Sequence, residues 1–363
     1  SLQVLPAADD PGVARAAAGA LRSLVLDGRF RELVIRKVDG DDVAVSPFRP
    51  TLLEAGFAAG YRGLLLRADR PGSPGATGSL SMSSRRPERG VPEGDTLFRT
   101  AAGLRPYLVG RTVTAARAGG PGPVPQLGRI VGREIRAVDS LGKNLLIRFD
   151  NGLEIRTHLR MNGTWHRYRP GERWRRPPAR ARLVIEVPGV VAVCFDAPVV
   201  ELLEQRAEAV HPALGGLGPD LLAPAFDRDD AVRRLREPAR ASANVAEALL
   251  DQRALAGIGN VYKSETLWLE RVSPFARVDE LDDPTLARLV DTARRLLLAN
   301  ASAARGPERI TTTGDRGAPG PLYVYRRTGR PCRRCGTPIV SARQGGDLPR
   351  TTYWCPSCQG LAR

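Results

Sequence analysis

The sequence predicts an α+β protein of several domains, in which a two-layer β-sandwich precedes a helical domain and a C-terminal zinc-finger β-hairpin. Three observations predict this order: short strands with turn signals from Val113 to Phe195, helical periodicity after His211, and two Cys-x2-Cys pairs near the end. A chain of 363 residues suits two or three domains, and its hydrophobic content of 42% is sufficient for ordinary cores.

The composition limits the classes of binding partner and the cellular compartment that we expect for this protein. Lysine and arginine outnumber aspartate and glutamate by 55 to 39, and the formal charge of +16 favours a polyanion, most commonly nucleic acid. Arginine-rich composition is also typical of GC-rich genomes, so charge alone is weak support. Four of the five cysteines form pairs, which indicates metal rather than a secreted disulfide framework. With no apolar run long enough for a bilayer and no signal-peptide core, we expect a cytoplasmic, nucleoid-associated protein without a membrane partner.

Residues 1–70 are predicted to form a small α/β segment, and residues 71–90 a flexible linker. The linker is rich in proline, glycine, serine and arginine, a composition that cannot pack a core. The expected elements of the first segment are a helix over 13–26 that ends at Asp27-Gly28, a strand over 31–38, a short helix over 52–55 and a closing strand over 63–67.

The β-sandwich domain is assigned to residues 91–210. It opens with a helix over 96–108, whose apolar residues recur at helical spacing. Asp150-Asn151-Gly152 is a strong hairpin signal, and Pro188-Gly189 joins a second strand pair. The expected strands lie around Val113 and over 135–138, 145–149, 153–159, 182–187 and 190–195.

Residues 211–305 are predicted to form the helical domain, and residues 306–363 the zinc-finger domain. Asp283-Pro284 opens one clear helix, because proline is favoured in the first helical turn. Its apolar face consists of Leu286, Leu289, Val290, Ala293, Leu296 and Leu297.

The cysteine pairs are the most specific local signal. Cys332-x2-Cys335 and Cys355-x2-Cys358 have the spacing of a four-thiolate zinc site, and four protein ligands leave no open position, so one structural Zn²⁺ is predicted. Arg350 begins a basic and aromatic strand that leads to the second pair. Zinc ribbons occur on many nucleic-acid proteins, so this motif names no reaction.

A glycine-rich turn is the second signal. Gly257-Ile258-Gly259-Asn260 predicts a tight turn, after which Asn260 begins the next helix. Exposed amides at a helix start, together with a short amide side chain, make an anion site. An ordinary glycine-rich helix connection is an equally good interpretation of these residues.

Three further positions carry weaker signals. Lys143 stands at the mouth of a predicted hairpin, where most lysines are simply solvated. His158 lies at the end of a predicted strand, and a lone histidine there is more often structural than functional. Cys194 lies within an apolar strand and is most simply a buried thiol.

Together with Val91-Pro92-Glu93-Gly94-Asp95-Thr96, these motifs resemble the formamidopyrimidine-DNA glycosylase/endonuclease VIII family from Val91 to the end of the chain. The resemblance implies a bifunctional DNA glycosylase/AP lyase of base excision repair, with a helix-two-turn-helix domain after the sandwich. It implies a monomer that binds damaged double-stranded DNA and abasic-site DNA. Asp95-Thr96, where many relatives place a second carboxylate at Thr96, favours the endonuclease VIII branch, which removes mainly oxidised pyrimidines and cleaves by β,δ-elimination.

The resemblance also implies roles for particular residues. Pro92 and Glu93 match the nucleophile and its neighbouring acid, and Lys143 matches the essential lysine of endonuclease VIII-like members. His158, Asn260 and Arg350 match residues that bind DNA phosphates. The side chains expected to fill the space left by the extruded base are Leu159, Arg160 and Met161.

The proposed chemistry requires a free imino group at Pro92. An α-amino group has a pKa of about 8, so much of it is unprotonated at neutral pH and able to attack C1′ of a damaged nucleotide. Within a chain, the proline nitrogen is an amide and is not nucleophilic. We expect Val91 to be the true start, removed as an initiator. Alternatively, a helicase–glycosylase fusion is cleaved at Gly90-Val91 and trimmed, or the fusion stays intact and its glycosylase part only binds DNA.

Residues 1–70 resemble the extreme C-terminus of Lhr-type large helicase-related proteins. The resemblance covers Leu26–Arg29, Leu33–Gly40, Ala55–Phe57 and Gly63–Arg67. The sequence contains no nucleotide-binding loop of the GxxxxGK[ST] type, so no helicase activity follows from it.

Overall fold

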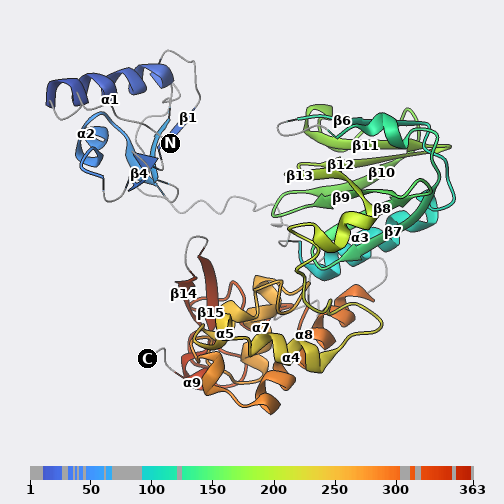
Figure 1. Cartoon of the computed structure of the whole chain (residues 1–363). Helices are drawn as coiled ribbons and strands as arrows, with labels where there is room; N and C mark the ends of the chain where they lie inside the picture. The colour runs from blue at the N-terminus through green and yellow to red at the C-terminus, as the bar shows by residue number, and fades with distance from the viewer. Residues whose placement is uncertain are drawn as a thin grey trace. The chain divides into compact units, whose positions relative to one another are not determined.

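The computed structural model consists of two compact units, Ser1–Ser84 and Arg85–Arg363 (Figure 1). The predicted linker over 71–90 and the turn at Asp27-Gly28 lie outside the described residues. The structure describes residues 11–26, 32–35, 37–38, 41–43, 46–60, 63–67, 92–120, 125–302, 311–314, 320–345 and 349–360.

The first unit is a small α/β structure. It comprises helices α1 (Pro11–Leu26) and α2 (Arg49–Glu54) and an antiparallel sheet of order β1-β5-β4. Its core includes Leu52, Phe57 and Leu64. The predicted strand over 31–38 is divided in two, because β2 pairs with β3 outside that sheet. The strand bounds are β1 (Glu32–Ile35), β2 (Lys37–Val38), β3 (Asp41–Asp42), β4 (Ala58–Gly60) and β5 (Gly63–Arg67).

The second unit begins with the predicted two-layer β-sandwich. One sheet has the order β10-β12-β11-β6 and the other β13-β9-β8-β7, and apolar residues from both form a common core. Every strand pair within them is antiparallel. The strands are β6 (Ala115–Ala118), β7 (Ile135–Leu141), β8 (Asn144–Phe149), β9 (Leu153–His158), β10 (Thr164–Tyr168), β11 (Ala181–Val187), β12 (Val190–Phe195) and β13 (Val199–Glu204).

Helix α3 (Gly94–Leu108) lies between the sandwich and the helical domain. It contacts β7 and β8 on one side and α8 (Asp283–Ala301) on the other. The expected apolar face of α3 is confirmed, since Leu97, Ala101, Leu104 and Leu108 are all buried. The N-terminus of α3 is thereby held at the junction of the two domains.

The helical domain follows the 3-10 helix η4 (Gln205–Val210). Its longest helix, α8, starts after the N-cap Asp282, whose side chain accepts a hydrogen bond from the Thr285 N–H (2.9 Å). The predicted apolar face of α8 is buried with Tyr262 of α7 in the core of this domain. The other helices are α4 (Arg228–Leu235), α5 (Pro238–Ala241), α6 (Val245–Ala248) and α7 (Asn260–Leu269).

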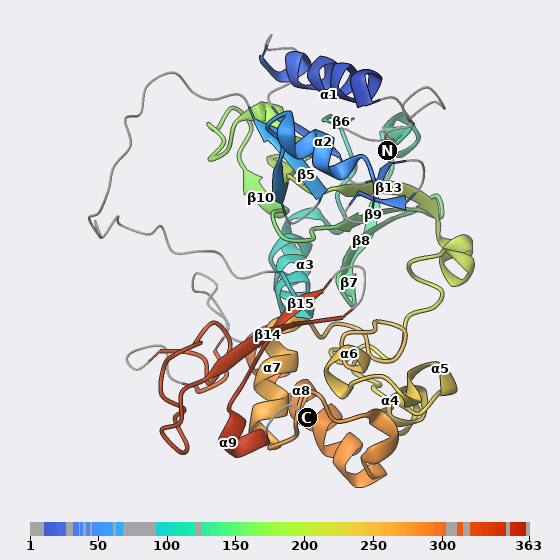
Figure 2. The same cartoon turned by 90° about the vertical axis from the view of Figure 1, so that its left-hand side faces the viewer.

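The chain ends in the hairpin of β14 (Val340–Gln344) and β15 (Arg350–Trp354), followed by the short helix α9 (Pro356–Gln359). β15 packs against α7, and Figure 2 shows the hairpin passing beside that helix. Within the described part of the chain, no helix is long and apolar enough to span a membrane.

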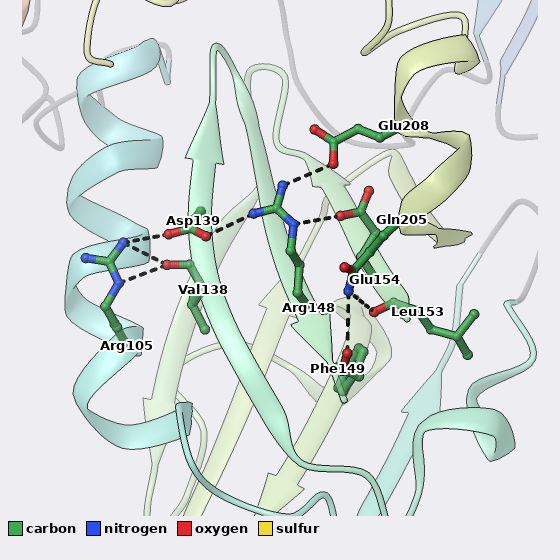
Figure 3. Close-up of polar contacts among 9 residues, drawn as sticks. All are labelled: Arg105, Val138, Asp139, Arg148, Phe149, Leu153, Glu154, Gln205 and Glu208. Carbon is green, nitrogen blue, oxygen red and sulfur yellow. Dashed lines mark hydrogen bonds and ion pairs between the residues drawn. The ribbon is translucent and has the colours of Figure 1, made fainter. Parts of the chain in front are cut away.

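A polar network attaches the connection between the two domains to the sandwich (Figure 3). The Arg148 guanidinium bonds to Asp139 (3.0 Å), to the buried Glu154 (3.2 Å) and to Glu208 of η4 (3.1 Å). Gln205 donates to the carbonyl oxygens of Phe149 and Leu153 at the adjoining hairpin (3.4 and 3.1 Å). These contacts fix the start of the interdomain segment on the sheet.

Candidate functional site

The centre of the site is a buried carboxylate at the start of two helices. Glu93 is the N-cap of α3 and is 1% exposed. Its two carboxylate oxygens accept hydrogen bonds from the backbone N–H groups of Gly259 and Val261, each at 2.8 Å, at the N-terminus of α7. The unpaired amides and dipole of a helix start favour an anion. The sequence led us to expect exposed amides here for an external anion; instead, Glu93 occupies them.

Two glycines allow this close approach. The N–H of Gly94 donates to the Gly257 carbonyl oxygen at 2.9 Å, and a Cβ on Gly94 would lie 2.9 Å from the Gly257 Cα. A Cβ on Gly259 would lie only 2.4 Å from the Glu93 carboxyl carbon. The glycine spacing therefore fixes where the acid sits.

Burial makes Glu93 a weak acid. Desolvation raises the pKa of Glu93 to about 7, while the Lys143 charge and the two backbone hydrogen bonds oppose the rise and Asp95 adds to it. A carboxyl group with a pKa near neutrality can both donate and accept a proton at physiological pH.

Lys143 lies on the tight turn between β7 and β8. Gly142 precedes it with a φ of +57°, and the Gly142 N–H donates to the Asp220 carboxylate at 2.7 Å. Burial lowers the pKa of Lys143 to about 8, against the raising effect of Glu93 and with a smaller lowering effect from Arg350. The lysine, the acid and Arg350 are therefore close enough to interact electrostatically, and Asp220 holds the turn that carries the amine.

Asp95 is a second buried carboxylate beside Glu93. It is fully buried in the first turn of α3, and its Oδ2 accepts from Arg99 at 3.1 Å. Burial raises the pKa of Asp95, and the Asp95 charge contributes to the raised pKa values of Glu93 and Tyr262. Pro92, half-buried, comes immediately before Glu93, and Val91 lies outside the described residues.

His158 is the last residue of β9, and its imidazole ring is neutral at physiological pH. Burial, followed by the charges of Arg156, Lys143 and Arg160, lowers the pKa of His158 to about 4. Its Nδ1 accepts from the Arg160 N–H at 3.2 Å, so the ring proton resides on Nε2. That N–H can donate to a phosphate oxygen without a charge on the ring.

The three candidate residues after His158, which are Leu159, Arg160 and Met161, differ in their exposure to solvent. Leu159 is 1% exposed and packs in the sandwich core, whereas Met161 is 58% exposed. Arg160 is exposed and has a φ of +45°. The buried position of Leu159 does not support its expected place in the DNA, because its side chain is part of the sandwich core.

The zinc hairpin is attached to α7 beside the buried acid. The side-chain Nδ2 of Asn260 donates to the Thr351 carbonyl oxygen at 2.8 Å, next to the exposed Arg350. Lys263, one turn further along α7, donates to the Thr352 hydroxyl at 2.7 Å. Burial lowers the pKa of Lys263 to about 7, against the charge of Glu93. Sequence reasoning missed Lys263 and Asp220; the helical spacing from Asn260 to Lys263 was the only local signal for either.

The four paired cysteines fit one structural Zn²⁺. Their Sγ atoms lie within 4.8 Å of one another. Tetrahedral Zn²⁺ with Zn–S bonds of about 2.3 Å places thiolates about 3.8 Å apart. The Cys332–Cys358 and Cys335–Cys355 sulfur pairs are 3.9 and 3.4 Å apart, and the backbone N–H of Arg334 donates to the Cys332 sulfur at 3.4 Å.

The sandwich, the helical domain and the zinc hairpin all have residues around this buried acid. Family models match three segments: the formamidopyrimidine-DNA glycosylase N-terminal domain over 91–198, its H2TH domain over 217–311, and the zinc finger found in FPG and IleRS over 329–360.

Curated relatives match the same part of the chain. The chain is 44% identical to the probable endonuclease 8 2 of Streptomyces coelicolor over 74% of this chain and 94% of that protein. It is 40% identical to the DNA-(apurinic or apyrimidinic site) lyase Nei2 of Mycolicibacterium smegmatis, over 74% of this chain and 99% of that protein. The chain therefore belongs to the formamidopyrimidine-DNA glycosylase/endonuclease VIII family, and it is a DNA glycosylase/AP lyase of base excision repair.

Solved structures support the fold. MutM in complex with DNA containing carbocyclic 8-oxo-G aligns with a TM-score of 0.61 and 23% identity, and Lactococcus lactis Fpg with an abasic site containing DNA gives the same two values. Each alignment covers 74% of this chain and 99% of the solved chain. The predicted fold class is confirmed, including the helix-two-turn-helix domain and the zinc finger.

Proposed function

We propose that this protein removes oxidised pyrimidines from double-stranded DNA and cleaves the strand at the resulting abasic site, with the Pro92 nitrogen as nucleophile. The observation that carries the proposal is the position of Glu93. It is the residue next to Pro92, it is buried, and burial raises its pKa to about 7 beside Lys143. An acid so placed can protonate a leaving oxygen at the carbon that Pro92 attacks.

The first stage replaces the base with the protein. The unprotonated imino nitrogen of Pro92 attacks C1′, and the bond between C1′ and the base breaks. The base departs with that electron pair and takes up a proton, while the newly bonded Pro92 nitrogen gives up its N–H proton. The bond between C1′ and the ring oxygen O4′ then breaks as Glu93 donates a proton to O4′, which leaves an iminium between Pro92 and C1′. Lys143 stabilises the ionised Glu93 that remains, since its charge lowers the pKa of the carboxyl group.

The second stage cleaves the strand. The iminium acidifies the proton on C2′, and its removal by ionised Glu93 expels the 3′ phosphate by β-elimination. A second elimination expels the 5′ phosphate, and water then hydrolyses the iminium to release the sugar fragment. Glu93 thus acts first as acid and then as base, and a pKa of about 7 suits both steps.

We assign the DNA contacts to the residues around this acid. His158 donates its Nε2–H to a phosphate, and Asn260 and the exposed Arg350 bind phosphates beside the lesion. Arg160 and Met161 enter the space left by the extruded base, which is least costly to extrude when it pairs poorly. Leu159 has no part in this assignment because it is buried in the core.

The substrate preference rests on the relatives named endonuclease 8 and on the Asp95-Thr96 pair. We place the protein's action on the chromosomal DNA of the cytoplasm, and propose that it acts as a monomer.

Borohydride trapping tests the nucleophile. A protein that begins at Pro92, mixed with duplex DNA containing an abasic site and borohydride, is expected to form a covalent protein–DNA adduct. The Pro92→Gly variant is expected to lose most of this adduct. Absence of an adduct from the protein that begins at Pro92 would refute the proposed chemistry.

The alternative for a form that retains residues 1–91 is DNA binding without catalysis, because the Pro92 nitrogen is then an amide. The full 363-residue chain is then expected to bind abasic-site DNA but give no adduct. Intact-mass measurement of the native protein, with N-terminal sequencing, decides which form the cell contains. An active native protein that retains Ser1 would exclude the Pro92 mechanism.

A further inference from the structure

An arginine-rich loop connects β10 to β11 on the sandwich. Between positions 160 and 180 the chain contains seven arginines and one acidic residue, Glu172. The loop, residues 169–180, starts at the far end of β10 and returns to the end where β10 begins, next to Met161. None of the DNA contacts proposed above lies in it.

The loop is firmly attached to the protein. Trp174 packs edge-on against Phe195, with ring centroids 5.7 Å apart, and stacks on Tyr168 at 6.0 Å. The Tyr168 hydroxyl accepts from the Arg175 backbone N–H at 3.0 Å. These contacts hold the Trp174 ring and the backbone at Arg175 in place.

One arginine joins the loop to the segment that carries Met161, and a second shares an aspartate with it. Arg176 pairs with Asp196 and also donates to the Asn162 carbonyl oxygen at 3.3 Å. Arg180 pairs with the other oxygen of Asp196 at 2.7 Å. Because Asn162 immediately follows Met161, the loop is anchored directly beside the residues proposed to enter the DNA.

The remaining arginines of the loop carry uncompensated charge. Arg169, Arg173 and Arg175 are exposed, and their guanidinium groups form no hydrogen bond or ion pair with any residue that the structure describes. Arg173 and Arg175 flank the packed Trp174, so their backbone is fixed while their side chains reach into solvent. Asp196 is already shared by two other arginines, and Glu172, the acid within the loop, accepts the backbone N–H of Arg169 at 2.9 Å.

We propose that the 169–180 loop is an additional DNA-backbone contact, in which Arg173 and Arg175 bind phosphates beyond those held at the lesion. The inference rests on the proposed function, because it requires Arg160 and Met161 to enter the duplex next to the loop. Guanidinium groups bind phosphate oxygens in a planar, two-pronged geometry, and a fixed backbone reduces the ordering cost on binding. The contact reads no sequence and strengthens binding to damaged and undamaged DNA alike.

The test uses the full chain and a fluorescent duplex with a central tetrahydrofuran site. The dissociation constant is measured as NaCl is varied from about 50 to about 200 mM for the parent and for the R173Q/R175Q variant. Each lost phosphate contact reduces the slope of log K against log salt by about 0.9, so the double variant is expected to lose about 1.8 from the slope. Its binding deficit should consequently shrink about tenfold over this range of salt.

The matched control is R129Q/R133Q. Arg129 and Arg133 are also exposed, belong to the same domain, and have guanidinium groups without a hydrogen bond to the described residues. Arg129 accepts a hydrogen bond through its backbone oxygen from Asn151, in the turn at the opposite end of β9 from His158. The control removes the same charge at the far end of the sheet and is expected to leave affinity and slope unchanged.

The charge-retaining R173K/R175K variant is expected to keep the parental slope, and thermal melting of all variants reports on folding. A parental slope in R173Q/R175Q, or an equal loss in the control, overturns the inference. A parent that binds the duplex without salt dependence refutes the proposed function instead. The two failures are therefore distinguishable.

Discussion

Substitution of Gly259 by alanine tests whether the two α7 amides position Glu93, the proposed catalytic acid. The backbone of Gly259 is extended, with a φ of −129°, so alanine adopts it without strain and only the added methyl group matters. That methyl would lie 2.4 Å from the Glu93 carboxyl carbon, whereas ordinary contacts begin near 3.4 Å. The carboxylate must therefore move by about 1 Å and lose its hydrogen bonds to the Gly259 and Val261 amides.

The expected loss follows from that displacement. A misplacement of about 1 Å at a reacting group costs on the order of 100-fold in rate. Two hydrogen bonds to a charged group contribute about 1.5–3 kcal/mol each, so the variant should also melt at a lower temperature. Single-turnover excision and borohydride trapping, with a protein that begins at Pro92, measure the rate.

Gly103→Ala is the control within α3. No atom lies within 4 Å of the position of its added Cβ, and Gly103 is exposed, so the variant should keep its activity and gain up to about 1 kcal/mol of helix stability. Parental excision by Gly259→Ala would show that the acid does not need the position seen here. That result would refute the role assigned to the glycine turn.

Three further predictions concern charge and metal. Because the folded-state pKa of Glu93 is raised from 4.5 to about 7, its ionisation destabilises the fold: stability is full below about pH 4.5 and falls as pH rises to about 7, by about 3 kcal/mol. Urea unfolding at pH 5 and pH 8 should show this fall in the parent and not in Glu93→Gln; equal pH dependence in both would contradict it. Asp220→Ala removes the acceptor of the Gly142 N–H and should cost about 1–3 kcal/mol and lower the excision rate through displacement of Lys143. Melting temperature and single-turnover rate check this, and an unchanged rate would exclude a positioning role. Chelation of Zn²⁺ should separate Arg350 from the site and abolish specific DNA binding, with a change in Trp268 fluorescence because its indole N–H donates to Cys332 at 3.4 Å. Specific DNA binding by a metal-free protein would contradict the proposed role of the zinc hairpin in DNA binding.

Elements with strong local periodicity could be predicted from the sequence. The apolar spacing of Leu97, Ala101, Leu104 and Leu108 predicted α3, and the cysteine spacing predicted the zinc site. The turn at Asp150-Asn151-Gly152 predicted the β8–β9 hairpin, which the structure confirms. In each case, the signal lies within a short stretch of chain, the longest being the 27 residues from Cys332 to Cys358, where sequence patterns are informative.

The elements that were missed lack such a pattern. β10 and β13 were not expected, since β10 is mostly half-exposed and β13 carries acidic residues among its apolar ones. The strand expected around Val113 begins two residues later, at Ala115.

The geometry of the site depends on contacts between distant parts of the chain. The bonds from Gly259 and Val261 to Glu93 span 166 and 168 residues, so no local pattern could reveal that the acid occupies the helix start. Leu159 was assigned to the DNA from the family resemblance, and only the tertiary structure shows that its side chain is buried in the core.

Glu93 comes from one domain, and the amides that hold it come from the other. The hydrogen bonds that seat Glu93 therefore form only when the sandwich and the helical domain are docked. With Glu93 as the proposed acid, we expect a molecule in which the two domains have not docked to bind DNA without cleaving it.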